Sequence, residues 1–236
     1  MRYLISLGLV IISPLCDPVT GLAQAGAHGE LADEPLVDVA KVDPSIVIDL
    51  RYATPCNVTG HPIYPPGTRC MIRSGVAERL KVAQLYLHRW GRGLKIWDAY
   101  RPSYAQKILW DHVKNYAFTA DPAKGRALHS WGVAVDVTLV DLKRHDVPMP
   151  TDFDDFTPSA RDFYTGPDPK VAQDVRLLKH AMHRAGFYGF YTEWWHYMAK
   201  DWKSYAPVTD AQLPAPPPRS PWWDWMKWPK FWEIGR

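Results

Sequence analysis

The segment Gly132–Val140 constrains the fold most, because it has the pattern of a β-strand with one apolar face and an acidic side chain on the other. Successive side chains of a strand point to opposite faces. One face holds Val133, Val135, Val137 and Leu139, and the other holds Gly132, Ala134, Asp136 and Thr138. Asp136 therefore points away from the apolar face, between residues small enough to leave room for a bulky group.

Helical and strand patterns alternate along the rest of the chain. Apolar spacing predicts one helix capped by Ser74 and ending before Gly91, a second from Pro102, and a third ending near Gly186. Further strands are expected at 45–50, 94–97 and 191–198. The short connections and the aromatic last strand favour an α+β domain, with a small antiparallel sheet flanked by helices, over a doubly wound parallel sheet.

Composition limits the classes of function. Of the 236 residues, 47% are apolar and 22% charged, which is typical of a globular protein. The 28 Lys and Arg residues are interspersed with the 25 Asp and Glu residues, and no basic stripe stands out. We therefore expect no nucleic acid as a partner.

The first 25 residues have the features of a signal peptide. A short basic start precedes the apolar stretch Leu4–Leu15, and Ala23-Gln24-Ala25 has the small residues of a cleavage site. We expect cleavage after Ala25 and export to the periplasm or the exterior; a retained anchor is the alternative. Residues 26–44 are expected to be a flexible lead-in, residues 45–207 the folded domain, and residues 208–236 a tail rich in Pro and Trp.

Export would leave two cysteines, Cys56 and Cys70, in an oxidising compartment. The even count predicts a disulfide that closes a loop of 15 residues, which the chain-entropy model values at about 3 kcal/mol. Two free thiols, or an isolated metal site, are the alternatives.

Two pairs of residues suggest metal chemistry. His129 lies at the entrance of the strand that carries Asp136, and Glu193 precedes His196 by three residues in an aromatic stretch. Together they offer three N and O ligands and a carboxylate that is free to act as a base, as a catalytic zinc site requires. Glu193 and His196 would oppose each other on a regular strand, so Glu193 must lie in a turn or bulge. The alternative is structural: a capping histidine, a hydrogen-bonded aspartate, and a surface glutamate on a core strand.

Six segments extend this pattern into a family resemblance. Across about residues 45–200, the chain resembles the D-alanyl-D-alanine dipeptidases, the VanX-like branch of the zinc D,D-peptidases, which includes D-Ala-D-Ala carboxypeptidases and shares its fold with the hedgehog domain. The matching segments are Asp49–Thr54, Asn57–Gly60, Trp97–Pro102, His129–Asp136, Phe153–Asp154 and Glu193–His196.

The resemblance implies roles for particular residues. His129, Asp136 and His196 would bind one Zn²⁺. Glu193 would act as the general base. Arg101 would stabilise the oxyanion, since a guanidinium is always charged and has fixed donors.

The resemblance also implies how substrate is bound. Asp154, with Tyr52 beside it, would bind the free amine of a dipeptide. Arg101 has a structural alternative, a surface ion pair with Asp98. Ala127 stands where the family usually has a serine, so any hydrogen bond from that serine to substrate is absent.

These roles predict an exported zinc dipeptidase that hydrolyses D-Ala-D-Ala or a similar cell-wall dipeptide. The alternatives are a D,D-carboxypeptidase on peptidoglycan stems and a non-catalytic zinc-binding module. The tail, with five Trp after Pro218, either contacts a membrane or cell wall or folds back over the domain. The sequence gives no indication of the oligomeric state.

Overall fold

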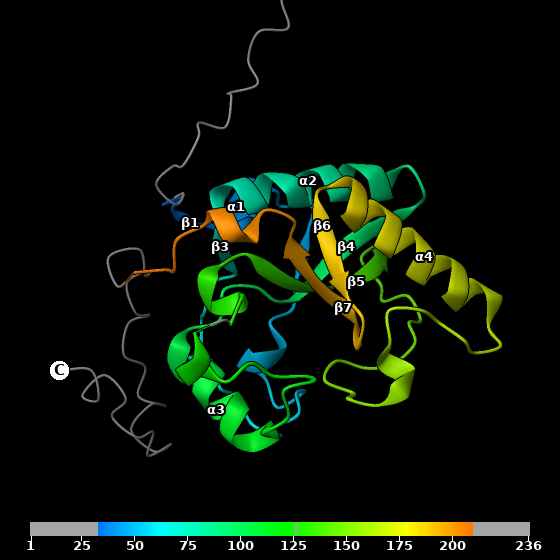
Figure 1. Cartoon of the computed structure of the whole chain (residues 1–236). Coiled ribbons are helices and arrows are strands. Elements are labelled where there is room, and N and C mark those ends of the chain that lie inside the picture. Colours follow the sequence, from blue (N-terminus) through cyan, green and yellow to red (C-terminus); the bar gives the residue numbers. More distant parts are fainter. Residues whose placement is uncertain (1–32, 126, 210–236) are drawn as a thin grey trace, which may run out of the picture. The chain divides into compact units, whose positions relative to one another are not determined.

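A five-stranded sheet forms the centre of the structure, a computed structural model that describes residues 33–125 and 127–209. Its strand order is β2-β4-β5-β7-β6 (Figure 1). β2 and β4 are parallel, and the other neighbours are antiparallel. The strands of this sheet are β2 (Val47–Ile48), β4 (Arg92–Asp98), β5 (Ala134–Asp141), β6 (Phe187–Phe190) and β7 (Glu193–Ala199).

Helices flank the sheet, which confirms the predicted α+β class. α2 and α4 contact each other and the sheet, whereas α3 lies apart from them (Figure 1). None of the helices in the described part of the chain is long and apolar enough to cross a bilayer. The helices are α1 (Val39–Val42), α2 (Ser74–His88), α3 (Ser103–Val113) and α4 (Pro169–Arg184).

Ordered structure begins earlier than the sequence predicts. Within the expected lead-in, β1 (Leu36–Asp38) pairs antiparallel with β3 (Met71–Arg73), and α1 follows it directly. Strand β1 is too short to show a clear periodicity, and its stability comes from the pairing with β3. The predicted signal peptide lies outside the described residues, as does the tail from residue 210 onward.

The start of α2 differs from the prediction that Ser74 caps it. Ser74 is the first residue of the helix, and its hydroxyl donates to the carboxylate of Glu34 at 3.1 Å. The same carboxylate accepts the N–H of Gly75 at 2.6 Å. A carboxylate from a distant segment thus satisfies the helix N-terminus, where backbone N–H groups have no partner within the helix.

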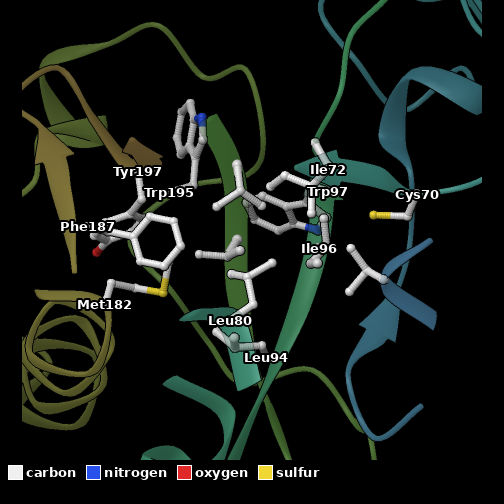
Figure 2. Close-up of a cluster of buried hydrophobic side chains, with 14 of the residues drawn as sticks. Cys70, Ile72, Leu80, Leu94, Ile96, Trp97, Met182, Phe187, Trp195 and Tyr197 are labelled. Carbon is white, nitrogen blue, oxygen red and sulfur yellow. The ribbon is translucent and has the colours of Figure 1, made fainter. Parts of the chain in front are cut away.

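The core lies between the sheet and the two long helices. Apolar side chains of the central strands meet those of α2 and α4 in one cluster (Figure 2). The apolar face predicted for β5 is buried as expected, since Val133, Val135, Val137 and Leu139 are all fully buried. This core holds β4, β5 and β7 in place, and these strands carry the site described below.

Cys56 and Cys70 are free, so the predicted disulfide is wrong. Cys56 is exposed, whereas Cys70 is buried in the core (Figure 2). A bridge would have to draw the Cys70 sulfur out of its apolar surroundings. The connecting loop has other restraints, because the Asn57 side-chain amide donates to the carbonyls of Thr54 at 2.7 Å and His61 at 2.9 Å. Burial raises the pKa of the Cys70 thiol, which makes it unreactive.

Arg73 joins three distant parts of the domain. Its guanidinium is fully buried and donates to the carbonyls of Trp131 at 3.1 Å, Ala206 at 2.6 Å and Glu34. These carbonyls belong to the N-terminal segment, the segment before β5 and the end of the folded domain. Hydrogen bonds to a charged donor are stronger than neutral ones, and a buried acceptor left alone is destabilising.

We predict that Arg73→Met lowers the free energy of unfolding by about 3 kcal/mol, because three partly buried carbonyls lose their charged donor while the apolar stem is kept. Urea denaturation measures this. Lys81→Met is the control: its surface pair with Glu78 is exposed, so the expected loss is below about 0.5 kcal/mol. Equal stabilities of the two variants would show that Arg73 does not join these segments.

Candidate active site

Asp136 and His196 meet because their strands are neighbours. They lie directly opposite each other in the antiparallel ladder of β5 and β7, where cross-strand side chains are close. Asp136 Oδ1 and His196 Nδ1 are 2.9 Å apart. The small residues beside Asp136 leave space for the ring, as the alternation in the sequence indicates.

His129 reaches this pair from a short helical turn, His129–Trp131, just before β5. Gly132 ends that turn with a φ of +69°, a conformation that favours glycine. A Cβ there would also lie 2.7 Å from Leu36 Cδ2. His129 Nε2 is consequently 3.1 Å from His196 Nδ1 and 3.4 Å from Asp136 Oδ1.

These three ligand atoms fit a tetrahedral metal. Zinc bonds of 2.0–2.2 Å place two ligand atoms about 3.4 Å apart, and the three separations here are 2.9, 3.1 and 3.4 Å. His129 Nδ1 lies 2.8 Å from the Ala99 carbonyl, a contact that leaves Nε2 as the free lone pair. Burial lowers the pKa of His196, which favours the neutral ring that a metal ion requires. Two imidazoles and a carboxylate suit Zn²⁺.

Glu193 begins β7 beside this group. Gly189 of β6 pairs with Tyr197, but the next residue, Phe190, pairs with Glu193. Three residues of β7 therefore have no partner on β6, and this irregularity is the bulge that the sequence requires. Glu193 Oε2 lies 3.9 Å from His196 Nδ1. Burial, reinforced by nearby carboxylates, raises the pKa of Glu193 well above its usual value, so it holds a proton readily.

Arg101 is buried at the end of the loop that follows β4. Its Nε and Nη2 donate to Asp98 Oδ2 at 2.9 and 2.7 Å. The guanidinium lies over the Tyr52 ring, 4.7 Å from its centroid, and 3.7 Å from Asp136 Oδ2. The pair with Asp98 exists, but both residues are buried, so it is not the surface ion pair of the structural alternative.

Asp154 and Tyr52 also meet. The Tyr52 hydroxyl donates to Asp154 Oδ1 at 3.1 Å, and the Val58 N–H donates to Oδ2 at 3.0 Å. Asp154 has a φ of +59°, which is uncommon for a residue other than glycine, and its side chain is buried. Burial raises the pKa of Asp154 to about 7, although these two donors and Arg101 oppose the rise.

One cavity of about 170 Å³ receives all of these groups. Its volume is small beside the 300–1,000 Å³ of sites for drug-sized ligands. Apolar and aromatic side chains form the remaining walls. The seven predicted site residues that line it are Tyr52, Arg101, His129, Asp136, Asp154, Glu193 and His196.

Comparison with known proteins places the chain in a family. The sequence profile of the family Peptidase_M15, D-ala-D-ala dipeptidase, matches residues 32–213. The chain belongs to this D-Ala-D-Ala dipeptidase family. It is 33% identical to the D-alanyl-D-alanine dipeptidase of Escherichia coli (strain K12) over 179 residues, 74% of this chain and 90% of that protein. It is 31% identical to that of Enterococcus faecium over 172 residues, 65% of this chain and 85% of that protein.

Members of this family are peptidases, so the site described above belongs to a peptidase. Ala127 lines the cavity with a methyl group, which supplies no hydrogen bond to a substrate.

Sequence reasoning missed two buried residues that support this dipeptidase site. Asp98 is fully buried; its Oδ1 accepts from the Tyr64 hydroxyl at 2.5 Å and its Oδ2 lies 3.4 Å from His129 Nδ1. Asp98 therefore contacts both Arg101 and His129. The Trp97–Pro102 segment contains Asp98, but its only assigned role was a surface pair, and no sequence signal indicates Tyr64.

We predict that Asp154 makes the metal-free protein lose stability as pH rises. The folded pKa of about 7 exceeds the ordinary 3.8, so the stability present below pH 4 is lost as the pH rises through 7. Between pH 4 and pH 8, wild type should lose roughly 4 kcal/mol relative to Asp154→Asn. Urea denaturation with a chelator measures the difference. The exposed Asp152→Asn is the control and should keep the wild-type pH dependence; a wild-type dependence in Asp154→Asn would contradict the prediction.

Proposed function

We propose that this chain is a zinc-dependent dipeptidase that hydrolyses D-Ala-D-Ala or a similar cell-wall dipeptide. The observation that carries the proposal is the convergence on one small cavity of a His, Asp and His group that could hold a metal, a buried glutamate, a guanidinium and a second buried carboxylate, that of Asp154. Family membership supports dipeptide hydrolysis. The donor set supports the zinc requirement.

His129 Nε2, Asp136 Oδ1 and His196 Nδ1 would hold the zinc ion. When bound, Zn²⁺ supplies the acidity that brings water close to ionisation at neutral pH and polarises the substrate carbonyl. A metal ligand of this type must be ionised. Burial alone would raise the pKa of Asp136, but the two histidines hold that pKa below the usual range, so the charged carboxylate is favoured.

Glu193 would move the proton. Its carboxylate faces the cavity beside His196, and burial makes it a stronger base than an exposed glutamate. It takes a proton from the attacking water as the bond to the carbonyl carbon forms. It then gives that proton to the amide nitrogen of the leaving residue as the peptide bond breaks.

Arg101 and Asp154 would orient the substrate. The guanidinium is held in one plane by Asp98 and Tyr52, so its remaining N–H groups need no reorganisation to stabilise negative charge on the carbonyl oxygen. Asp154 would pair with the substrate ammonium, which favours the charged carboxylate over the protonated form. In a dipeptide, the ammonium group is on the same residue as the scissile carbonyl. A longer peptide has an uncharged amide at that position.

We expect Glu193→Gln to lower kcat on D-Ala-D-Ala by at least 10²-fold while the protein keeps its zinc, because general-base transfer is worth about 10²–10⁴-fold. Arg101→Ala should cause a similar loss by removing the charge that stabilises the oxyanion. D-alanine release and elemental analysis measure the two properties. His129→Ala should lose both zinc and activity, and the exposed Glu78→Gln should retain both. More than a tenth of wild-type kcat in Glu193→Gln would exclude its role as base.

Acetylation of the substrate amine tests Asp154. N-acetyl-D-Ala-D-Ala should show a kcat/KM at least 10²-fold below that of D-Ala-D-Ala, because it leaves Asp154 buried without its cation. Asp154→Asn should lose activity on the free dipeptide, so the ratio of kcat/KM between the free and acetylated substrates should fall. Asp152→Asn should keep the wild-type ratio. Equal rates on both substrates, or faster release of D-alanine from a stem pentapeptide, would favour the carboxypeptidase alternative.

A further inference from the structure

Gln106 connects Arg101 to a wall of the cavity. It lies on α3, is 2% exposed and lines the cavity. Its Oε1 accepts from Arg101 Nη1 at 3.0 Å, and its Nε2 donates to the Ala120 carbonyl at 2.6 Å. One side-chain amide thus joins the guanidinium proposed to act in catalysis to a segment 14 residues away.

The contact completes the restraint of the Arg101 guanidinium. Asp98 holds Nε and Nη2, and the Tyr52 ring lies against one face. Gln106 is the partner of Nη1, the nitrogen that Asp98 does not reach. A neutral acceptor here fixes the plane without consuming positive charge, which remains available for the substrate.

The segment Phe118–Ala120 forms part of the cavity wall. Phe118 stacks on Phe156, which also lines the cavity, with ring centroids 4.6 Å apart. The Thr192 hydroxyl donates to the Ala117 carbonyl at 3.0 Å in an exposed contact. Gln106 holds the same segment from the interior. This hydrogen bond is partly buried, and it restrains the segment more strongly than the exposed Thr192 contact does.

The contacts follow an order that matches a dipeptide. Asp154 contacts Tyr52, Tyr52 contacts Arg101, Arg101 contacts Gln106, and Gln106 contacts Ala120. A dipeptide carries, in the same order, an ammonium, the scissile carbonyl and the C-terminal residue. With the ammonium at Asp154 and the carbonyl at Arg101, the C-terminal residue lies against Gln106 and the Phe118–Ala120 wall.

We propose that Gln106 is a positioning residue that makes the site selective for a small C-terminal residue, by fixing this wall relative to Arg101. The inference rests on the proposed dipeptidase function and adds a structural determinant of selectivity. A wall held by Gln106, Phe156 and Thr192 cannot withdraw to admit a large side chain, so a bulky C-terminal residue is excluded by steric repulsion.

Two substitutions separate the two contacts of Gln106. Gln106→Met keeps the length of the side chain and removes both hydrogen bonds. Gln106→Glu keeps an acceptor for Arg101 but removes the donor to the Ala120 carbonyl. The zinc-loaded proteins are assayed with D-Ala-D-Ala and D-Ala-D-Phe, and the ratio of their kcat/KM values is the selectivity. Both substrates carry the same carboxylate, so repulsion from a new glutamate cancels in this ratio.

We expect both variants to lower the selectivity for D-Ala-D-Ala about 10-fold or more, a change typical of hydrophobic pocket contacts. Gln106→Met should also lower kcat on D-Ala-D-Ala about 10-fold, and Gln106→Glu should lower it less, because Arg101 keeps its acceptor. A purely structural residue would not produce this division between kcat and selectivity.

Gln84→Met is the matched control. Gln84 is also 2% exposed on a helix, and its amide accepts from the Leu94 N–H at 2.6 Å and donates to Ser45 Oγ at 3.0 Å, outside the cavity. It should lower the melting temperature without changing selectivity. If folded Gln106→Glu kept the wild-type selectivity, or if Gln84→Met changed selectivity as much as the Gln106 variants, the inference about Gln106 would be overturned. The proposed dipeptidase function would not be affected by either result. A zinc-loaded wild type that leaves D-Ala-D-Ala intact would overturn the proposed function as well.

Discussion

A concentration of buried negative charge governs this structure. Asp98, Asp136, Asp154 and Glu193 lie in or beneath one cavity, and Arg101 is the guanidinium among them. Water cannot solvate these carboxylates fully, so each must find a partner or retain a proton. Asp98 has Arg101 and Asp136 has two imidazoles, whereas burial raises the pKa values of Asp154 and Glu193. Such a cavity favours positive ligands, and the proposed zinc ion and substrate ammonium meet that requirement.

The sheet and an aromatic layer give this charge cluster its geometry. Strands β4, β5 and β7 are neighbours. Asp136 of β5 and both Glu193 and His196 of β7 line the cavity, and Asp98 at the end of β4 holds Arg101, which also lines it. Behind them, Trp97 contacts Phe153 and Trp194 with ring centroids 5.5 Å apart, and Trp195 at 6.4 Å. Large rings with few rotatable bonds pack rigidly. The polar groups are therefore held near their working positions, as catalysis by positioned charges requires.

Much of the candidate site could be predicted, because its residues are of types that bind metals or transfer protons and lie in recognisable short segments of the sequence. His129, Asp136, Glu193 and His196 are ligand or base types beside strand patterns, and the family resemblance added Arg101, Asp154 and Tyr52. The supporting residues could not be found in this way. Tyr64 and Gln106 are ordinary residue types in a loop and a helix, and they matter only through contacts 34 and 5 residues away along the chain.

The sequence by itself determined the α+β class, the apolar face of β5 and the need for a bulge at Glu193, because alternation and helical spacing act over a few residues. Only the tertiary structure decided that Asp136 faces His196, that Glu34 supports the start of α2 and that Cys70 is buried away from Cys56. Strand order, register and burial depend on packing summed over the whole domain. Local sequence patterns do not contain this information, so they do not by themselves specify which distant residues pair.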